Sequence, residues 1–249
     1  MSEAGHRSPN PEKPARQGRL TQALMGWMTR SARVATVDVL SPHFRLVGLE
    51  GDALKAVAWE AGQKVQVSMH GFAMRTYTPV SWDAADGATK LLVFSHGEGP
   101  GSLWASGLQA GDACQFFGPR RSLQLSGLGA PTVLFGDETS FALAMALGGT
   151  PQGAGAVHLF EVTDPAESRQ VAEAIGLGDA HLVARTAGDG HLAAMEAEIV
   201  RLAAGGANVV LTGKAGSIQR MSRALKSAGI ATSRIMAKAY WAPGKTGLD

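Results

Sequence analysis

The hydrophobic pattern of the chain changes near residue 130, and this change restricts the possible folds more than any other feature. Before it, apolar residues occur in short segments separated by turns, and Lys64–Met69 alternates strictly between polar and apolar residues. Such a pattern is typical of half-buried antiparallel strands, and it predicts a small barrel or sandwich. A short helix is expected over Ser102–Leu108. The expected strands are Arg33–Leu40, Phe44–Leu49, Lys64–Met69, Met74–Val80, Lys90–Ser95 and Asp112–Phe117.

After residue 130, strand-like and helix-like segments alternate with short links between them. One helix start is well marked, because Asp164 can cap the helix, Pro165 suits its first turn and Glu167 is acidic. This alternation predicts a doubly wound parallel α/β sheet, whose ligands bind at the carboxyl ends of the strands. The expected strands are Pro131–Phe135, Ala154–Phe160, His181–Ala184, Asn208–Leu211 and Arg234–Ala237. The expected helices are Glu138–Leu147, the segment between Asp164 and Gly176, His191–Ala204 and Ser217–Ala228.

The 249 residues are therefore expected to form three parts. These are a disordered tail over residues 1–25, an antiparallel β-barrel domain over residues 26–128 and a doubly wound α/β domain over residues 129–249. Hydrophobic residues make up 45% of the chain and charged residues 18%, which suits a globular protein and excludes a chain that is disordered throughout. The natural ligand site of this arrangement is the cleft between the two domains.

Several classes of protein receive no support from the composition. Cys114 is the single cysteine, so an intrachain disulfide and a cysteine-only metal site are excluded. The formal net charge is only +2, which gives no reason to expect nucleic acid. No apolar run reaches the roughly 18 residues of a membrane span, and the first twenty residues do not read as a secretory signal. We expect a cytoplasmic monomer with no metal site and no membrane partner.

Arg75, Tyr77 and Thr78 form the first group of candidate binding residues. Arg75 and Tyr77 share one face of their strand by its period of two. The guanidinium can grip a pyrophosphate bidentately. The tyrosine ring can cover an isoalloxazine, and the threonine hydroxyl can hydrogen-bond near the reactive nitrogen of that ring. By themselves, however, the same residue types also suit an ordinary exposed edge strand.

The segment from Gly99 to Trp104 forms the second group. Gly99, Gly101 and Ser102 precede or begin the expected short helix, where backbone N–H groups can approach an anion. His96 lies just before them, at the end of the expected strand Lys90–Ser95. In isolation, this segment equally suits an ordinary turn and helix cap, and a lone histidine is commonly structural or solvated.

The order of these motifs resembles the siderophore-interacting protein family. The relevant segments are RTYT, LLVFSHGEGPGSLWA, Gly111-Asp112, GPRRS and FGDETSFALAMAL, followed by Gly213-Lys214-Ala215-Gly216 and Tyr240-Trp241. Members are flavin-dependent ferric-siderophore reductases on the ferredoxin–NADP reductase scaffold. The resemblance extends from about residue 30 to about residue 241, and it implies an FAD-binding barrel followed by an α/β domain that binds a nicotinamide nucleotide.

The resemblance also implies which residues bind the two cofactors. The residues that match the family's FAD-binding motifs are Arg75, Tyr77, Thr78, His96, Gly99, Gly101, Ser102 and Trp104. The match to the family's GDET turn brings Gly136, Asp137, Glu138 and Thr139 to the nucleotide site. We expect Asp137 and Thr139 to cap the helix that follows. Because two acids would repel a pyrophosphate, this turn suits the nicotinamide end or a structural role. No catalytic side chain is expected, since the flavin carries the chemistry.

Two features disagree about which nucleotide is used. Glu161 ends the second strand of the α/β domain, where an acid often favours a free ribose 2′-hydroxyl. Arg185 ends the third strand, and with Lys214 it would form a positive rim suited to a 2′-phosphate. Arg185 and Lys214 would equally suit solvated surface positions without a ligand. On balance we expect NADPH, with NADH as the alternative.

The electron acceptor implied by the resemblance is a ferric siderophore, which is often anionic. Lys238 and Lys245 are the candidate substrate residues, because they lie on either side of Tyr240-Trp241. The chain departs from the family at Val80 and after Trp241, where arginines are common, so the acceptor is less certain than the cofactor. One alternative is a protein acceptor such as a ferredoxin, a flavodoxin or a haem protein. The other is a non-catalytic module that binds flavin or an iron chelate.

Overall fold

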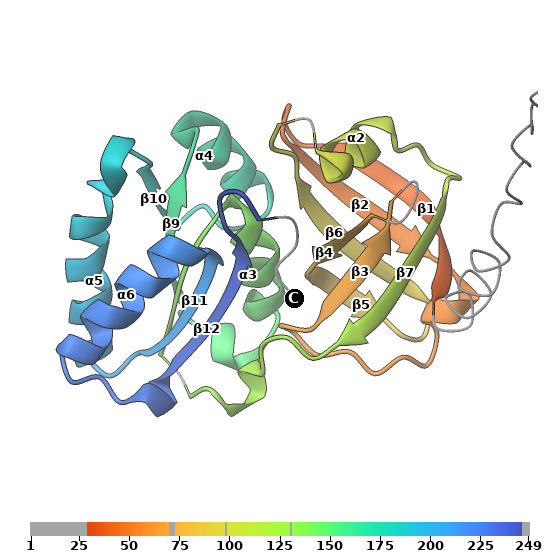
Figure 1. Ribbon diagram of the computed structural model, residues 1–249. Coiled ribbons are helices and arrows are strands. Elements are labelled where there is room, and N and C mark those ends of the chain that lie inside the picture. Colours follow the sequence, from red (N-terminus) through yellow and green to blue (C-terminus); the bar gives the residue numbers. More distant parts are fainter. Residues whose placement is uncertain (1–28, 70–72, 98, 130, 246–249) are drawn as a thin grey trace, which may run out of the picture.

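The computed structural model of the chain describes residues 29–69, 73–97, 99–129 and 131–245. The predicted tail, residues 1–25, lies outside the described residues. An antiparallel sheet is followed by a parallel sheet that is covered by helices (Figure 1). The strands of the first sheet are β1 (Arg30–Val39), β2 (Phe44–Glu50), β3 (Lys64–Ser68), β4 (Met74–Tyr77), β5 (Pro79–Asp83), β6 (Ala88–Phe94) and β7 (Ala113–Arg120). Those of the second sheet are β8 (Thr132–Asp137), β9 (Val157–Val162), β10 (His181–Ala184), β11 (Asn208–Lys214) and β12 (Ile235–Trp241).

The helices connect these strands. The α-helices are α2 (Pro100–Gly107), α3 (Phe141–Gly148), α4 (Pro165–Ala174), α5 (Leu192–Ala204) and α6 (Ala215–Ser227). The short 3₁₀ helices are η1 (Asp52–Leu54), η2 (Leu125–Gly127), η3 (Glu138–Ser140), η4 (Pro151–Gly153), η5 (Ala187–Asp189) and η6 (Thr232–Arg234). The α2 helix confirms the one expected over Ser102–Leu108. Among the described residues, no helix is long and apolar enough to cross a membrane.

The first sheet is strongly curled. Its strand order is β4-β3-β7-β1-β2-β6-β5, so β4 and β5 lie at opposite ends of the order. Only Thr78 separates these two strands in the sequence, and the two edges of the sheet therefore come together at Thr78. No ladder of hydrogen bonds joins β4 to β5 within the described strands, so the predicted barrel exists as a curled but not fully closed sheet.

One predicted strand is wrong in a way that matters for the site. Met74–Val80 was expected to be continuous, whereas the structure divides it at Thr78 into β4 and β5. Val65 of β3 pairs with Tyr77, and Leu91 of β6 pairs with Pro79. Proline lacks an N–H and restricts the residue before it, which favours a strand end at this point. The break leaves Thr78 at the seam between the two edges.

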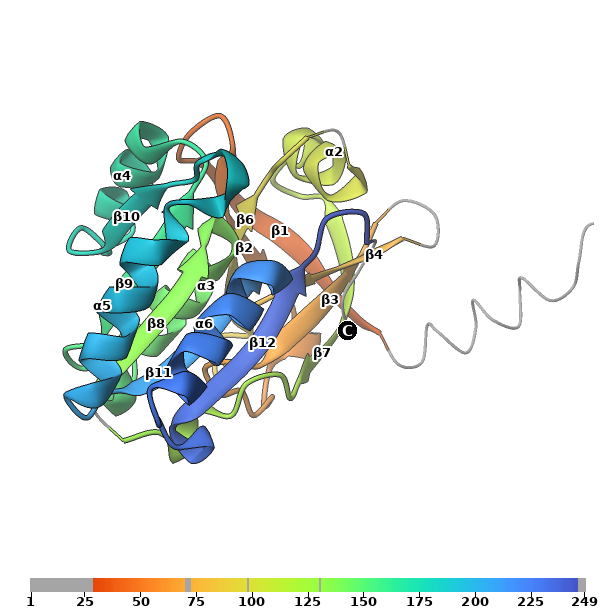
Figure 2. The ribbon, with the colours of Figure 1, turned by 60° about the vertical axis from the view of Figure 1, so that its left-hand side comes forward.

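The second sheet is parallel throughout and has the order β10-β9-β8-β11-β12. Its inner strand β11 is buried from Val209 to Gly213, as expected for a strand that is covered on both faces. Helices α3 and α4 pack on one face and α5 and α6 on the other (Figure 2). This arrangement confirms the doubly wound fold. As predicted, Asp164 caps α4, and its carboxylate accepts hydrogen bonds from the N–H groups of Ala166 and Glu167.

Helix α3 holds the two sheets together. It is buried on almost all sides, which suits a helix enclosed by a core. The ring of Phe141 lies 5.6 Å from Phe44 of the first sheet and 4.8 Å from Phe160 of the second, measured between centroids. One hydrophobic cluster includes residues of both sheets. This shared core fixes the carboxyl edge of the parallel sheet against the first sheet.

Candidate functional site

Strand β4 and helix α2 bring the first predicted residues together. Arg75 and Tyr77 are half-buried on β4. A Cβ added at Gly101 of α2 would lie 3.2 Å from the Tyr77 hydroxyl and 3.3 Å from Cγ of Arg75, so the helix backbone passes close to both side chains. The Tyr77 ring also packs against Trp104, at 5.9 Å between centroids. The structure thus brings the two groups of candidates together.

The charge of Arg75 is available for a ligand. Its Nη1 donates a hydrogen bond of 2.8 Å to the carbonyl of Met74, and within the described residues no carboxylate pairs with it. Beside it, Gly99 caps α2 without a side-chain hydrogen bond, and no atom of another described segment lies within 4 Å of the position of a Cβ there. An uncompensated guanidinium next to an open helix N-terminus suits the diphosphate of a dinucleotide.

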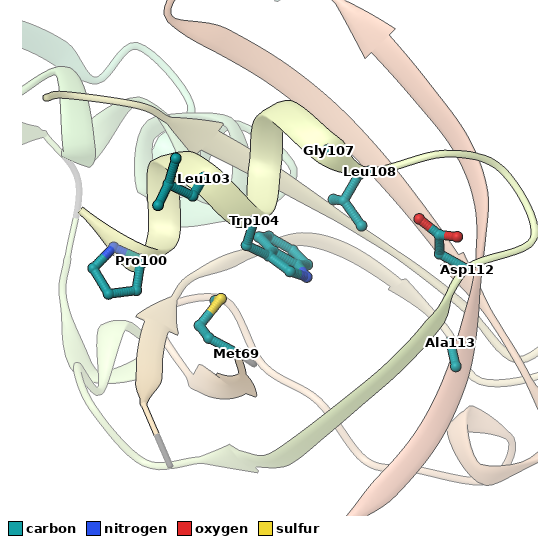
Figure 3. Close-up of a pocket in the computed structure, with 8 residues that line it drawn as sticks. All are labelled: Met69, Pro100, Leu103, Trp104, Gly107, Leu108, Asp112 and Ala113. Atoms are coloured by element: carbon teal, nitrogen blue, oxygen red, sulfur yellow. The ribbon is translucent and has the colours of Figure 1, made fainter. Parts of the chain in front are cut away.

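A pocket of about 650 Å³ continues from this point along α2 (Figure 3). Trp104 and Leu103 line it from the helix, Met69 from the end of β3, and Asp112 from the segment before β7. Leu103 is 64% exposed, which is unusual for a large apolar side chain. The volume lies in the range of small-molecule sites, and the lining is mostly apolar with a few polar groups.

The carboxyl end of β12 meets the seam of the first sheet. The Tyr240 side chain lies against Thr78, and burial raises the pKa of its phenol. The Trp241 ring lies 6.3 Å from the ring of His96, between centroids. We call these four residues the junction. Tyr240 and Trp241 were not among the predicted site residues, although their place at the end of a parallel strand was a usable signal.

The predicted GDET turn has the expected capping geometry. The Asp137 carboxylate accepts hydrogen bonds from the backbone N–H (2.9 Å) and the hydroxyl of Thr139. Ser140 completes the capping box, since its hydroxyl accepts from the N–H of Asp137 at 3.3 Å. Asp137 is thus the cap and Thr139 its donor, not a second cap. Gly136 is required here, because a Cβ would collide with the Ser140 side chain.

Three carboxylates surround one guanidinium beneath the carboxyl edge. Arg185 lies 3.0 Å from Glu138, 3.5 Å from Asp137 and 3.6 Å from Glu161. Glu161 also binds Nε2 of His191 at 2.8 Å. All four partners are buried. We call these five residues the buried network. Burial raises the pKa of Asp137, against the opposing effect of hydrogen bonds from Thr139 and Trp241 and of the charge of Arg185.

The network changes how two predicted residues are understood. Arg185 was expected to be a free cation at the rim, but its side chain is only 20% exposed and is paired with acids. It also donates a 2.7 Å hydrogen bond to the Thr163 hydroxyl and lies 5.8 Å from the Trp241 ring. Glu161 is fully buried instead of facing a ribose. Sequence reasoning missed His191, because its partner lies 30 residues away.

The predicted lysines have different surroundings. Lys214 is paired with Asp189, with N–O distances of 2.9 and 3.2 Å. Lys238 is half-buried on β12 and shares a strand face with Met236, which packs toward α3 and the first sheet; the register of β12 shifts after Ala239. Lys245 is exposed, and its backbone N–H closes a turn onto Ala242. Across the described residues, no group of three or more His, Cys, Asp or Glu side chains is arranged to hold a metal ion.

An antiparallel curled sheet followed by a doubly wound parallel sheet is the arrangement of a reductase-like fold, and the cradle between β4 and α2 suits a dinucleotide such as FAD. The family model for siderophore-interacting proteins matches residues 130–244, and the model for the siderophore-interacting FAD-binding domain matches residues 63–123. The chain therefore belongs to the siderophore-interacting protein family, and the prediction of FAD is confirmed. No curated protein matches the chain significantly.

Solved structures share this fold at low sequence identity. A siderophore utilization protein from T. fusca is 22% identical with a TM-score of 0.69, and the match covers 89% of this chain and 95% of that one. The siderophore-interacting protein SipS from Aeromonas hydrophila is 19% identical (TM-score 0.68, 88% and 93% covered). A ferredoxin NADP+ reductase from Neisseria gonorrhoeae, solved with FAD and NADP, is 15% identical (TM-score 0.68, 86% and 99% covered).

Proposed function

We propose that the chain is a flavin-dependent reductase that uses a nicotinamide nucleotide to reduce ferric iron held by a siderophore. FAD, when bound, supplies two-electron acceptance from the nucleotide and one-electron release to iron. The overall reaction converts one reduced nucleotide and two Fe(III) into one oxidised nucleotide, one proton and two Fe(II). The protein needs no general acid or base for this, and its contribution is positioning and electrostatics.

The observation that carries this proposal is the contact between the side chains of Tyr240 and Thr78. Tyr240 is the penultimate residue of the edge strand β12, and Thr78 lies at the seam of the first sheet. In doubly wound sheets, ligands bind at the carboxyl ends of the strands. The contact supports the proposal, because electron transfer between two cofactors requires the nucleotide-binding edge to lie beside the predicted flavin residues.

The chain's own residues fit FAD along one continuous path. Thr78, which belongs to the junction, and the preceding Tyr77 would contact the flavin ring. Arg75 and the open N-terminus of α2 suit the diphosphate, because they supply positive charge and free backbone donors. The pocket lined by Leu103 and Trp104 begins where this helix begins, and its apolar walls suit the adenine ring.

Lys238 and Lys245 would attract the ferric siderophore. Lys238 lies on β12, two residues before Tyr240, and Lys245 follows four residues after Trp241. Exposed lysines steer anionic ligands through a field that salt screens. The siderophore would then approach the flavin from the β12 side of the junction.

Steady-state assays with different acceptors test the proposal. We expect the FAD-loaded protein to produce Fe(II) from anionic ferric siderophores, detected with an Fe(II)-specific chelator, at a rate that falls as ionic strength rises. The double variant Lys238→Glu and Lys245→Glu should lower kcat/KM for these chelates and leave flavin reduction by nucleotide intact. Faster transfer to a ferredoxin or flavodoxin than to any chelate would contradict the proposed acceptor, and the absence of nucleotide turnover would indicate a binding module.

A further inference from the structure

We infer that the buried network makes this chain selective for a nucleotide with a free ribose 2′-hydroxyl, so that NADH and not NADPH is the electron donor. The inference rests on the proposed function, because it concerns the nucleotide of that same reaction. It differs from the expectation drawn from the sequence, which assigned a 2′-phosphate to Arg185 and Lys214.

The position of the ribose follows from the topology. In the strand order β10-β9-β8-β11-β12, strands β9 and β10 follow β8 on one side and β11 and β12 lie on its other side. The switch point is therefore between β8 and β11, and ligands bind in the crevice outside the carboxyl ends of the strands at such a point. The ends of β9 and β10 are then the places where a 2′-hydroxyl or 2′-phosphate is distinguished. Glu161 lies near the end of β9, and Arg185 directly follows β10.

Arg185 is not free to bind a phosphate. It is the cation shared by Asp137, Glu138 and Glu161, whose side chains are at most 2% exposed. If it turned outward, at least two buried carboxylates would lose their guanidinium partner, and uncompensated buried charge is strongly unfavourable. The arginine therefore serves the network and is unavailable to a ligand.

The neighbouring cations are also engaged. Lys214 pairs with Asp189, and Arg220 pairs with Glu196 at 2.5 Å while donating to the carbonyl of Asp189. The ion pairs named at this edge, all among the described residues, thus contain five carboxylates and three Lys or Arg side chains. The five carboxylates outnumber these three cations even when His191, the partner of Glu161, is counted as a fourth. A dianionic 2′-phosphate would meet net negative charge, whereas a hydroxyl would not.

Binding of two non-redox probes tests this directly. ADP-ribose and its 2′-phosphorylated form are titrated calorimetrically into the FAD-loaded protein, and flavin reduction by NADH and NADPH is measured in parallel. We expect ADP-ribose to bind at least about tenfold more tightly, because juxtaposed like charges are costly at a binding site. Equal or tighter binding of the 2′-phosphorylated probe, or failure of both probes to bind, would overturn the inference.

These measurements separate the inference from the proposed function. If neither nucleotide reduces the flavin while ADP-ribose is still preferred, the proposed reductase activity is wrong and the ribose selectivity stands. If NADPH reduces the flavin with the higher kcat/KM, the reductase activity stands and the selectivity is wrong.

The variant Asp189→Asn tests the role of charge at the edge. It releases Lys214, and asparagine tolerates the left-handed backbone of Asp189, whose φ is 56°. We expect binding of the 2′-phosphorylated probe to improve about two- to fivefold, with a smaller change for ADP-ribose. Glu198→Gln is the matched control, because it releases Arg201 near the far end of α5 with the same change in charge. Equal improvement in both variants would contradict a local effect.

The variant Arg185→Lys distinguishes a role of Arg185 in the buried network from a role in binding the ligand. Lysine keeps the charge but not the planar fork that reaches several carboxylates. We expect a lower thermal midpoint and an equal effect on both probes. A loss confined to the 2′-phosphorylated probe would show that Arg185 binds phosphate and would overturn the inference.

Discussion

The indole Nε1 of Trp241 donates a 2.7 Å hydrogen bond to Oδ2 of Asp137, although 104 residues separate the two in the sequence. This bond ties the last strand of the parallel sheet to the turn after its first strand. The approach is close enough that a Cβ at Gly213, on the strand between them, would collide with the Asp137 carboxylate. The geometry of the junction thus depends on the buried network.

The variant Trp241→Phe tests this link. It removes the indole donor and leaves a fully buried acceptor short of a partner, so we expect the free energy of unfolding to fall by about 1–3 kcal/mol in urea titrations. Trp82→Phe is a suitable control, since Trp82 donates only to the neutral carbonyl of Leu54 and should lose about 0.5–1.5 kcal/mol. A smaller loss at Trp241 than at Trp82 would contradict the importance of the network.

The variant Arg75→Ala tests the diphosphate site. Loss of a charge-assisted contact should weaken FAD binding by roughly 1.5–3 kcal/mol, measured by fluorescence titration of flavin-free protein. The matched control is Arg33→Ala, which removes an exposed arginine that pairs with Glu50 on the same sheet. Unchanged FAD affinity in Arg75→Ala would show that the diphosphate lies elsewhere.

The variant Leu103→Asp tests the placement of adenine in the pocket. If the adenine binds there, the new carboxylate should weaken FAD binding and leave FMN binding nearly unchanged, since FMN has no adenine. An apolar contact of this size contributes about 1–2 kcal/mol. Val39→Asp provides the control, because Val39 is equally exposed and lies outside the pocket. Equal losses for FAD and FMN in Leu103→Asp would contradict this placement.

A pH-dependent contact joins the two sheets away from the junction. Glu167 of α4 accepts hydrogen bonds from the backbone N–H of His43 (3.0 Å) and from Ser41, and contacts Nδ1 of His43 at 2.8 Å. Burial opposes ionisation of Glu167, but these hydrogen bonds outweigh it and lower the pKa of the carboxyl. A lowered pKa in the folded state means that the carboxylate stabilises the fold above the ordinary value of about 4.3.

Glu167→Gln should therefore lower stability by about 1 kcal/mol at neutral pH, because His43 is half-exposed and the contact is partly screened. The difference from the natural chain should shrink as the pH falls through the lowered pKa, where both chains carry a neutral side chain. Chemical denaturation over a pH series measures this. Glu173→Gln on the exposed side of the same helix should show no such pH dependence, and a parallel effect there would contradict the account.

Local signals in the sequence were sufficient for most of the fold. The strict alternation in Lys64–Met69 predicts β3, and the capping residues at Asp164 predict the start of α4. The division of Met74–Val80 at Thr78 was not predictable in the same way. It depends on β3 and β6, which pair with the two halves from opposite edges of the curled sheet.

The site shows the same contrast. The cradle of Arg75, Tyr77 and Gly101 follows motifs that are readable in sequence. The role of Arg185 is not readable in the sequence, because its nearest acidic partner, Glu138, lies 47 residues away. An arginine at the surface and an arginine in a buried ion pair cannot be distinguished from the sequence alone. Ionic partners of this kind are set by the sheet order and by burial.

The most direct test of the proposed function is the anaerobic visible spectrum of the FAD-loaded protein during a single turnover. The yellow flavin absorption should disappear on addition of NADH and return when a ferric siderophore is added, with two Fe(II) trapped for each NADH consumed. A protein that binds no FAD, or whose reduced flavin is not reoxidised by any ferric siderophore, would contradict the account.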